Sequence, residues 1–222
     1  MKALQLPPTL VEQVHKAILS DIASGKLPAG ARIIQEQIAQ ELGVSRQPVQ
    51  QALTLLRKEG VLSDAPGRGL QVAPLDLAHV QQMYDVRAVI EGLAFCKAAE
   101  MSAARAKDKG PALIRAGRKA AASGSVSAMI AADMAFHEFI YALSGNPLVA
   151  PAMQTHWTHA QRVMGEVLMR DDKPRDIWDQ HEALLEAVAS GKGTQAERMA
   201  RQHIIEAADF MIARLKAEGQ GR

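Results

Sequence analysis

The segment from Gly43 to Leu62, GVSRQPVQQALTLLRKEGVL, constrains the fold more than any other part of the chain. Four apolar residues in it recur at helical spacing and predict a buried stripe: Val49, Ala52, Leu53 and Leu56. Ser45 is expected to be the N-cap, with its hydroxyl available to a free amide of the first turn. Pro48 costs little there, because first-turn amides have no intrahelical partner. The polar residues must therefore face outward: Arg46, Gln47, Gln50 and Gln51.

The flanking sequence places this helix in a larger motif. Helical patterns over residues 9–24 and 32–43 precede it, and Gly43 is expected to make the left-handed turn between the second and third helices. After it, two short apolar patches at 61–62 and 70–72 flank a Pro-Gly-Arg-Gly turn, which predicts a hairpin. Residues 1–75 are therefore expected to form a winged helix-turn-helix.

An exposed helix N-terminus that carries arginine and amide side chains is suited to reading DNA bases. Arginine pairs with guanine and glutamine with adenine, and each good contact discriminates by about 1 to 3 kcal/mol. A solvated helix face is the alternative for this pattern alone. The preceding helix and the wing favour DNA binding.

Residues 76–222 are expected to form an all-α bundle. Aromatic residues are scarce and helix-forming residues common, so intrinsic preference favours helix. Gly and Pro mark most of the gaps between six predicted stretches: 77–101, 105–123, 126–144, 147–169, 173–190 and 194–217.

Three of these stretches carry a histidine in line with apolar residues. Asp133 and His137 are four residues apart and share one helix face. His181 lies in line with Leu184 and Val188, and His203 in line with Ala207 and Phe210. A lone histidine on such a stripe is ordinarily a core residue. Three with a nearby carboxylate also form the ligand set of a divalent metal, so both interpretations stay open.

The first part of the chain resembles the GntR family of bacterial transcription regulators. The resemblance is carried by LPAGARI (27–33), IAQELGVSRQPVQQALTLLRKEGVL (38–62) and PGRGLQV (66–72). It implies DNA contacts by Arg32, Arg46 and Arg68, besides the other exposed polar residues of the recognition helix. Glu36 and Gln50 stand where the family usually has arginine, so the operator is expected to differ from that of better-known relatives.

The second part resembles the FCD effector domain of the FadR branch of this family. YDVRAVIEGLAFCKAA, DMAFHEFIYALSGNPLV, DQHEALLEAVASGK and MARQHI carry the resemblance over residues 78–216. It implies that Asp133, His137, His181 and His203 hold a divalent metal, with zinc, nickel and manganese all open. It also implies that Arg87 faces the effector pocket. A helix-surface ion pair with Glu91 is the alternative for Arg87.

His156 and His159 lie within one turn of each other but do not match the family's ligand positions. We expect them at a pocket rim or in solvent.

The expected function is that of a homodimeric, metabolite-responsive repressor that binds an inverted repeat in double-stranded DNA and responds to a small organic acid. The alternative is a metal-dependent hydrolase fused to a DNA-binding domain, since such a metal can also activate water. Cys96 is the only cysteine, and no apolar run reaches the about 20 residues that a membrane helix needs. We expect a cytoplasmic protein that is neither an enzyme nor bound to a membrane.

Overall fold

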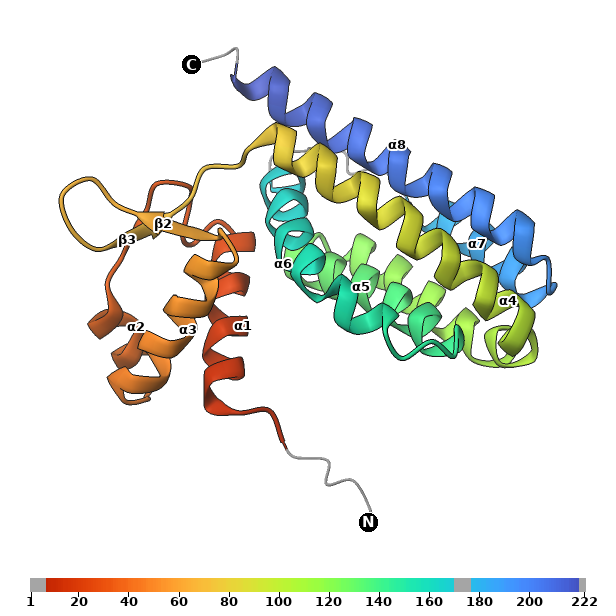
Figure 1. Cartoon of the computed structure of the whole chain (residues 1–222), viewed down its shortest axis with the longest axis horizontal. Coiled ribbons are helices and arrows are strands. Elements are labelled where there is room, and N and C mark those ends of the chain that lie inside the picture. Colours follow the sequence, from red (N-terminus) through yellow and green to blue (C-terminus); the bar gives the residue numbers. More distant parts are fainter. Residues whose placement is uncertain (1–6, 170–176, 220–222) are drawn as a thin grey trace. The chain divides into compact units, whose positions relative to one another are not determined.

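The computed structural model describes residues 7–169 and 177–219. The chain divides into two compact units, Met1–Leu75 and Asp76–Arg222. Figure 1 shows both units with most of their helices and strands labelled.

The first unit is a three-helix domain with a small sheet. Its helices and strands are α1 (Leu10–Ala23), β1 (Arg32–Ile33), α2 (Gln35–Glu41), α3 (Arg46–Lys58), β2 (Leu62–Asp64) and β3 (Leu70–Val72). Thr9 caps α1 in a capping box with Glu12, and the buried residues of α1 and α3 pack with those of β2 and β3. Val49, Ala52 and Leu56 of the predicted stripe are fully buried. The winged helix-turn-helix is therefore confirmed.

The sheet corrects one expectation. A helix was expected over residues 32–43, but Arg32 and Ile33 form a strand, and α2 begins only at Gln35. Arg32 pairs with Gln71 in the antiparallel order β1-β3-β2. The partner that makes Arg32 and Ile33 extended lies nearly 40 residues away, so the local pattern could not reveal it.

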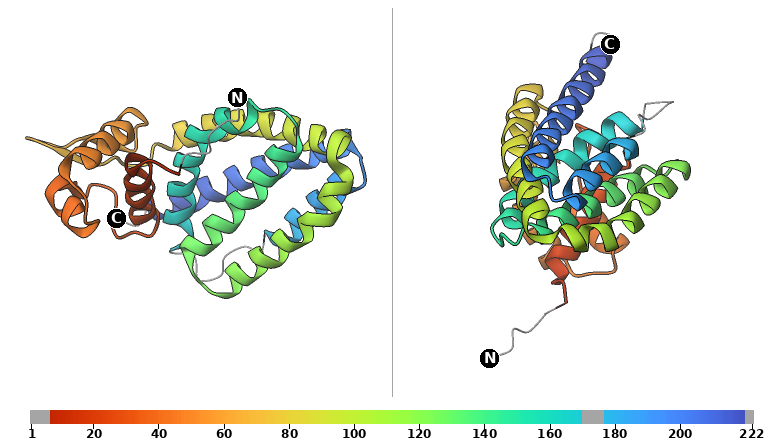
Figure 2. Two further views of the ribbon diagram at one scale, coloured as in Figure 1. Left: turned by 90° about the horizontal axis from the view of Figure 1, so that it is seen from below. Right: turned by 90° about the vertical axis from the view of Figure 1, so that its right-hand side faces the viewer.

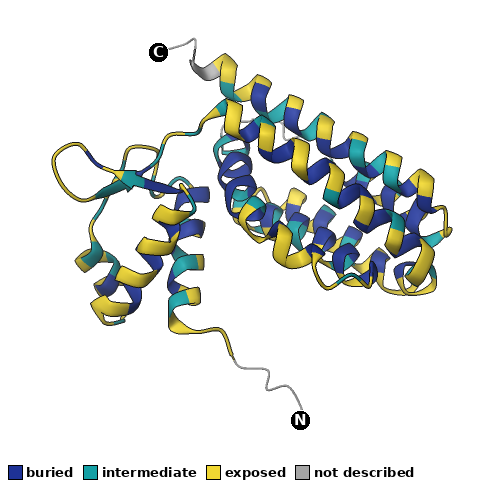
Figure 3. Cartoon of the chain, in the orientation of Figure 1, coloured by how far each residue is buried: buried dark blue, intermediate teal, exposed yellow. Residues whose placement is uncertain are grey.

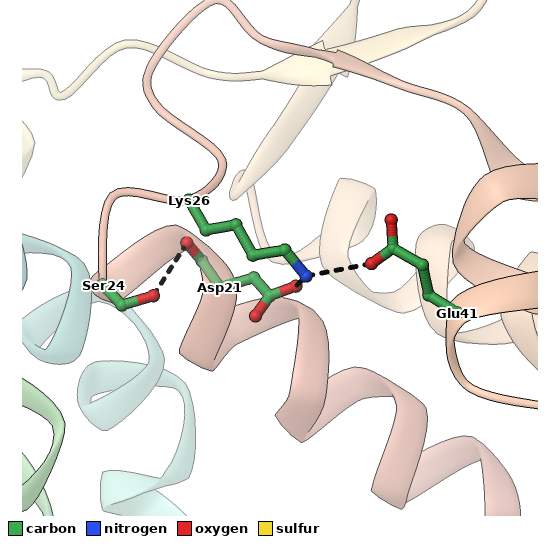
Figure 4. A network of polar contacts seen from close by, with 4 residues as sticks. All are labelled: Asp21, Ser24, Lys26 and Glu41. Carbon is green, nitrogen blue, oxygen red and sulfur yellow. Dashed lines mark hydrogen bonds and ion pairs between the residues drawn. The ribbon is translucent and has the colours of Figure 1, made fainter.

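A lysine links the end of α1 to α2. Lys26 Nζ lies 3.0 Å from Asp21 Oδ2 and 2.9 Å from Glu41 Oε2, and the Ser24 hydroxyl donates to the Asp21 carbonyl (Figure 4). The Lys26 side chain is 57% exposed, so solvent screens both ion pairs and each contributes little to stability. The buried apolar contacts between the helices, rather than this network, hold the unit together.

The second unit is a helical bundle. Its elements are α4 (Leu77–Ala122), α5 (Val126–Leu143), α6 (Val149–Leu168), α7 (Trp178–Ala189) and α8 (Gly193–Gly219). α4 is two helices in one element, since Ser102 has non-helical angles (φ −140°, ψ 24°). The second half runs back from this break (Figure 2). The break separates the first two of the predicted helical stretches.

The helices of the bundle have buried inner sides and exposed outer sides (Figure 3), and most of the buried residues are apolar. α7 packs on the second half of α4, where a Cβ added at Gly117 would lie 2.0 Å from Trp178 Cζ2. The glycine therefore allows the indole to approach the α4 backbone. The fifth predicted stretch began at residue 173, and its positions 173–176 lie outside the described residues. The expectation of a mostly α protein is confirmed.

Candidate DNA surface and buried histidine cluster

The predicted DNA-contacting residues of α3 lie on its exposed side. Arg46, Gln47, Gln50 and Gln51 are exposed, while the opposite side of the helix is buried in the core. Ser45 is the N-cap and is exposed, but its side chain makes no capping hydrogen bond. The prediction that the Ser45 hydroxyl accepts a hydrogen bond from a first-turn amide is therefore wrong. Instead, Gln35 Nε2 donates to the Arg46 carbonyl at 2.8 Å and ties the start of α2 to the start of α3.

Arg46 is paired with a residue of α2. Its guanidinium forms an ion pair with the Glu36 carboxylate, and both side chains are about 70% exposed. Glu36 stands where the family usually has arginine. Since it also holds Arg46, it influences the orientation of the main basic side chain of this surface.

The wing carries the other two predicted arginines. Arg32 Nη2 donates to the Pro66 carbonyl at 2.8 Å, so its side chain lies against the wing turn. Gly67 and Gly69 flank Arg68 with φ values of 90° and 92°, a region that favours glycine. Arg68 is therefore presented, exposed, at the tip of the turn.

The structure brings the three predicted histidines of the second unit together. His137 of α5, His181 of α7 and His203 of α8 are buried, and their ligand atoms all lie within 4.8 Å of one another. Asp133 is also buried, and its Oδ1 lies 3.5 Å from His181 Nε2. The four residues come from three helices, α5, α7 and α8, each of which packs on α4.

The chemistry of this cluster fits a divalent cation. Within residues 7–169 and 177–219, neither buried ring nitrogen of His181 has a hydrogen-bond partner, which is costly unless something else binds them. Burial and the neighbouring histidines hold the pKa of His181 well below its ordinary value, so its imidazole is neutral. Neutral imidazole and carboxylate are the forms that bind metals.

Two further residues, Glu91 and Gln180, orient His137 and His203. Glu91 Oε2 lies 2.5 Å from His137 Nδ1, an ion-pair contact without good hydrogen-bond alignment. His203 Nδ1 lies 2.9 Å from Gln180 Oε1, and Gln180 in turn donates to Glu206. An acceptor beside Nδ1 favours the tautomer with the proton there, so that Nε2 carries the lone pair that a metal would use.

Arg87 is buried and already has partners. Its guanidinium contacts Glu91 Oε1 at 2.8 to 2.9 Å and stacks on the rings of Tyr84 and Trp157. Burial would lower the pKa of Arg87, but the charge of Glu91 outweighs it and raises the pKa above its ordinary value. With exposed fractions of 3% and 0%, Arg87 and Glu91 are not a helix-surface pair, so that alternative is wrong.

A cavity of about 310 Å³ opens beside the cluster. Its polar lining residues are Tyr84, Arg87, Asp133, His137, Gln180 and His203. The other described residues that line it are apolar, apart from the single N–H of Trp178: Ala121, Met129, Ile130, Met164, Leu168, Ile177, Trp178, Ile204, Ala207, Phe210 and Met211. His181, fully buried behind this wall, does not line it.

The sequence reasoning missed the roles of Glu91 and Gln180. Glu91 is four residues from Arg87, a signal for a pair between them but not for a contact with His137. Gln180 directly precedes His181, yet it contacts His203, and no periodicity indicates this. Neither His156 nor His159 lines the cavity; His156 is half-buried, and His159 is buried against the ring of His79. A solvated role for His159 is therefore wrong.

Among the described residues, α5 is the one helix long and apolar enough to cross a membrane by length and composition. A core helix of a bundle satisfies the same criterion, and the buried side of α5 carries Asp133 and His137.

Two family models match the chain. The model of bacterial regulatory proteins of the gntR family matches residues 10–72, and that of the FCD domain matches residues 82–206. The resemblance inferred from the sequence motifs is confirmed. These two regions contain the exposed face of α3 and the histidine cluster, respectively.

Individual relatives agree with this assignment. A helix-turn-helix transcriptional regulator from an unstable DNA locus of Streptomyces ambofaciens is 29% identical over 81% of this chain and 75% of its own length. The transcriptional repressor RspR of Escherichia coli is 23% identical over 91% of this chain and 90% of its own. The solved structure of E. coli McbR has a TM-score of 0.78 at 20% identity and covers 94% of this chain and 100% of its own. The chain belongs to the GntR family of DNA-binding transcriptional regulators, in the branch whose second domain is an FCD domain.

Proposed function

We propose that the chain is a homodimeric repressor whose affinity for its operator is controlled by an organic acid bound beside a divalent metal ion. The observation that carries this proposal is the cluster of three buried histidines and Asp133 in and behind the wall of a cavity in the FCD domain. The DNA surface lies in the other unit, so an effector acts on DNA binding through the arrangement of the two.

Asp133, His137, His181 and His203 would hold the metal. Nitrogen and oxygen donors of this kind suit zinc, nickel and manganese alike. The metal would supply positive charge at one end of the cavity, where an acidic group can bind. Glu91 neutralises the charge of Arg87. The positive charge that favours an anionic ligand would therefore come from the metal, and Arg87 would add hydrogen-bond donors beside it.

On the DNA, Arg46, Gln47, Gln50 and Gln51 would read base edges in the major groove. Ser45, Arg32 and Arg68 would contact the backbone or the adjacent groove. The names of relatives such as RspR support repression. The protein would bind an inverted repeat in cytoplasmic DNA. Because such a repeat has two half-sites, two copies of the chain are required.

Part of α4 supports dimerisation through the second unit. Val86, Val89 and Leu93 follow one another at helical spacing and are 43 to 54% exposed. Such an exposed apolar stripe is typical of a protein interface. Val89→Asp should therefore yield a monomer in analytical ultracentrifugation, while a variant that remains dimeric would exclude this face.

The hydrolase alternative is not favoured. Asp133 is the only carboxylate among the described residues that line the cavity. As a metal ligand it is not available as a general base, and Glu138 is exposed.

Metal analysis combined with DNA titration tests the proposal. His181→Ala should lose bound metal and the response of DNA binding to organic acids, yet bind the operator without acid as the wild type does. His156→Ala, a histidine outside the cluster, should keep both properties. Metal retained by His181→Ala, or no metal in the wild type after reconstitution, would mean that the cluster is ordinary core.

A further inference from the structure

The cavity of the second unit has two chemically different ends. The described polar lining residues lie close to one another, several of them joined through Glu91. Glu91 contacts both Arg87 and His137, the His137 and His203 rings are 6.0 Å apart, and Gln180 contacts His203. Arg87 also stacks on Tyr84, and Asp133 is one helical turn from His137. These residues therefore form one polar end.

The apolar lining residues extend away from that end along two helices. On α8, those at 204, 207, 210 and 211 all follow His203. On α5, the lining residues Met129 and Ile130 both precede Asp133 and His137. Eight residues of helix span about 12 Å, which is the distance from His203 to Met211 or from His137 to Met129 along each axis. Met164 and Leu168 of α6 complete this apolar wall.

We propose that the effector is an organic anion with a single acidic group and an apolar body, such as an aliphatic or arylalkyl monocarboxylate. This inference rests on the proposed function, which supplies the acidic group of the effector. The new part is that the rest of the effector is apolar. The acidic group binds at the polar end, and the apolar body lies along Ile204, Ala207 and Phe210.

The apolar end discriminates against other acids. Among the described lining residues there, only the Trp178 indole carries a polar hydrogen. Beyond that N–H, the described residues there offer a hydroxyl or a second carboxylate no partner to replace its lost hydration, which weakens the binding of a hydroxylated acid and weakens that of a second charge more. Sugar acids and dicarboxylates are therefore poor ligands. The volume of about 310 Å³ is at the lower end for small-molecule pockets, which limits the body to a short chain or one ring.

Calorimetric titration of the metal-loaded protein tests the proposal with defined acids. The probes are butyrate, hexanoate, octanoate and decanoate, with suberate as the dicarboxylate of octanoate length and gluconate as the hydroxylated acid. Each added methylene should raise the affinity about fourfold, until the body exceeds the roughly 12 Å of apolar wall. The heat capacity change of binding should also become more negative with chain length. Suberate and gluconate should bind about a hundredfold more weakly than octanoate.

Two matched variants locate the binding. Ala207→Phe fills the apolar end and should lower octanoate affinity at least tenfold, with metal content unchanged. Ala213→Phe places the same side chain on the exposed side of α8 and should change nothing. Should Ala207→Phe fail to fold, the smaller Ala207→Leu gives the same comparison.

The outcomes separate this inference from the proposed function. Affinity that is flat across the chain-length series, tighter binding of suberate or gluconate, or octanoate binding that survives Ala207→Phe would overturn the apolar-bodied ligand. Each of those results would leave an acid-responsive regulator standing. Failure of every carboxylate to bind the metal-loaded protein would overturn the proposed function as well.

Discussion

Replacement of Glu91 by glutamine should destabilise the second unit more than any change at an exposed ion pair. Glu91 is fully buried and receives Arg87 on one oxygen and His137 on the other. Burial by itself would raise the pKa of Glu91, but the charges of His137 and Arg87 outweigh it and lower the pKa to about 2. The carboxylate is therefore ionised and shared between two buried groups.

The isosteric amide cannot replace the negative charge that Glu91 shares with both partners. When the glutamine oxygen accepts from the Arg87 guanidinium, its NH₂ group faces His137 Nδ1, which accepts only as a neutral imidazole with its proton on Nε2, and Arg87 keeps an uncompensated buried charge. Removing one partner of a buried ion pair costs about 3 to 5 kcal/mol, because the other charge stays buried without compensation. For a protein of this size, that loss should lower the melting temperature by about 10 to 15 °C.

Tryptophan fluorescence is the suitable assay, because both tryptophans, Trp157 and Trp178, lie in the second unit. Melting in the presence of a chelator removes any contribution from bound metal. The matched control is Glu197→Gln on α8, which breaks an Arg–Glu pair of the same spacing whose side chains are 35 to 38% exposed. The control should cost about 0.5 kcal/mol or less.

A second variant separates the ion pair from a general packing defect. Arg87→Met combined with Glu91→Gln removes both charges, so it should be about 2 kcal/mol more stable than Glu91→Gln alone. A loss below about 1 kcal/mol in Glu91→Gln, or simple additivity in the double variant, would refute the role assigned to this pair.

Three further predictions concern other parts of the molecule. Arg46→Ala should weaken binding to an operator selected from random DNA by about 1 to 3 kcal/mol in a gel-shift titration, whereas Arg57→Ala, at the far end of the same helix, should have less effect. Equal losses would contradict the assigned docking face. Gln50→Arg should steepen the dependence of log affinity on log salt by about one unit; an unchanged slope would place Gln50 away from phosphate. Gly117→Ala should cost about 1 to 3 kcal/mol in the same fluorescence melt, because the new Cβ would overlap the Trp178 ring, and a neutral or stabilising effect would show that the indole moves freely aside.

The sequence alone determined the winged helix-turn-helix and the helical character of the second unit. Helical periodicity is local: the spacing of Val49, Leu53 and Leu56 decides which side of α3 is buried, whatever surrounds it. The same periodicity places Asp133 and His137 on one face of α5. Family motifs then identified the regulator family without any coordinates.

Only the tertiary structure decided how these faces meet. The contact of Glu91 with His137 joins two helices, and that of Gln180 with His203 joins two others. Such contacts depend on how each helix is rotated about its own axis and on how closely it approaches its neighbour, as α7 approaches α4 at Gly117. The periodicity of one helix predicts neither its rotation nor this distance. The asymmetry of the cavity arises in the same way, since its polar and apolar ends are formed by residues from five helices whose order along the chain does not reveal which of them line one space.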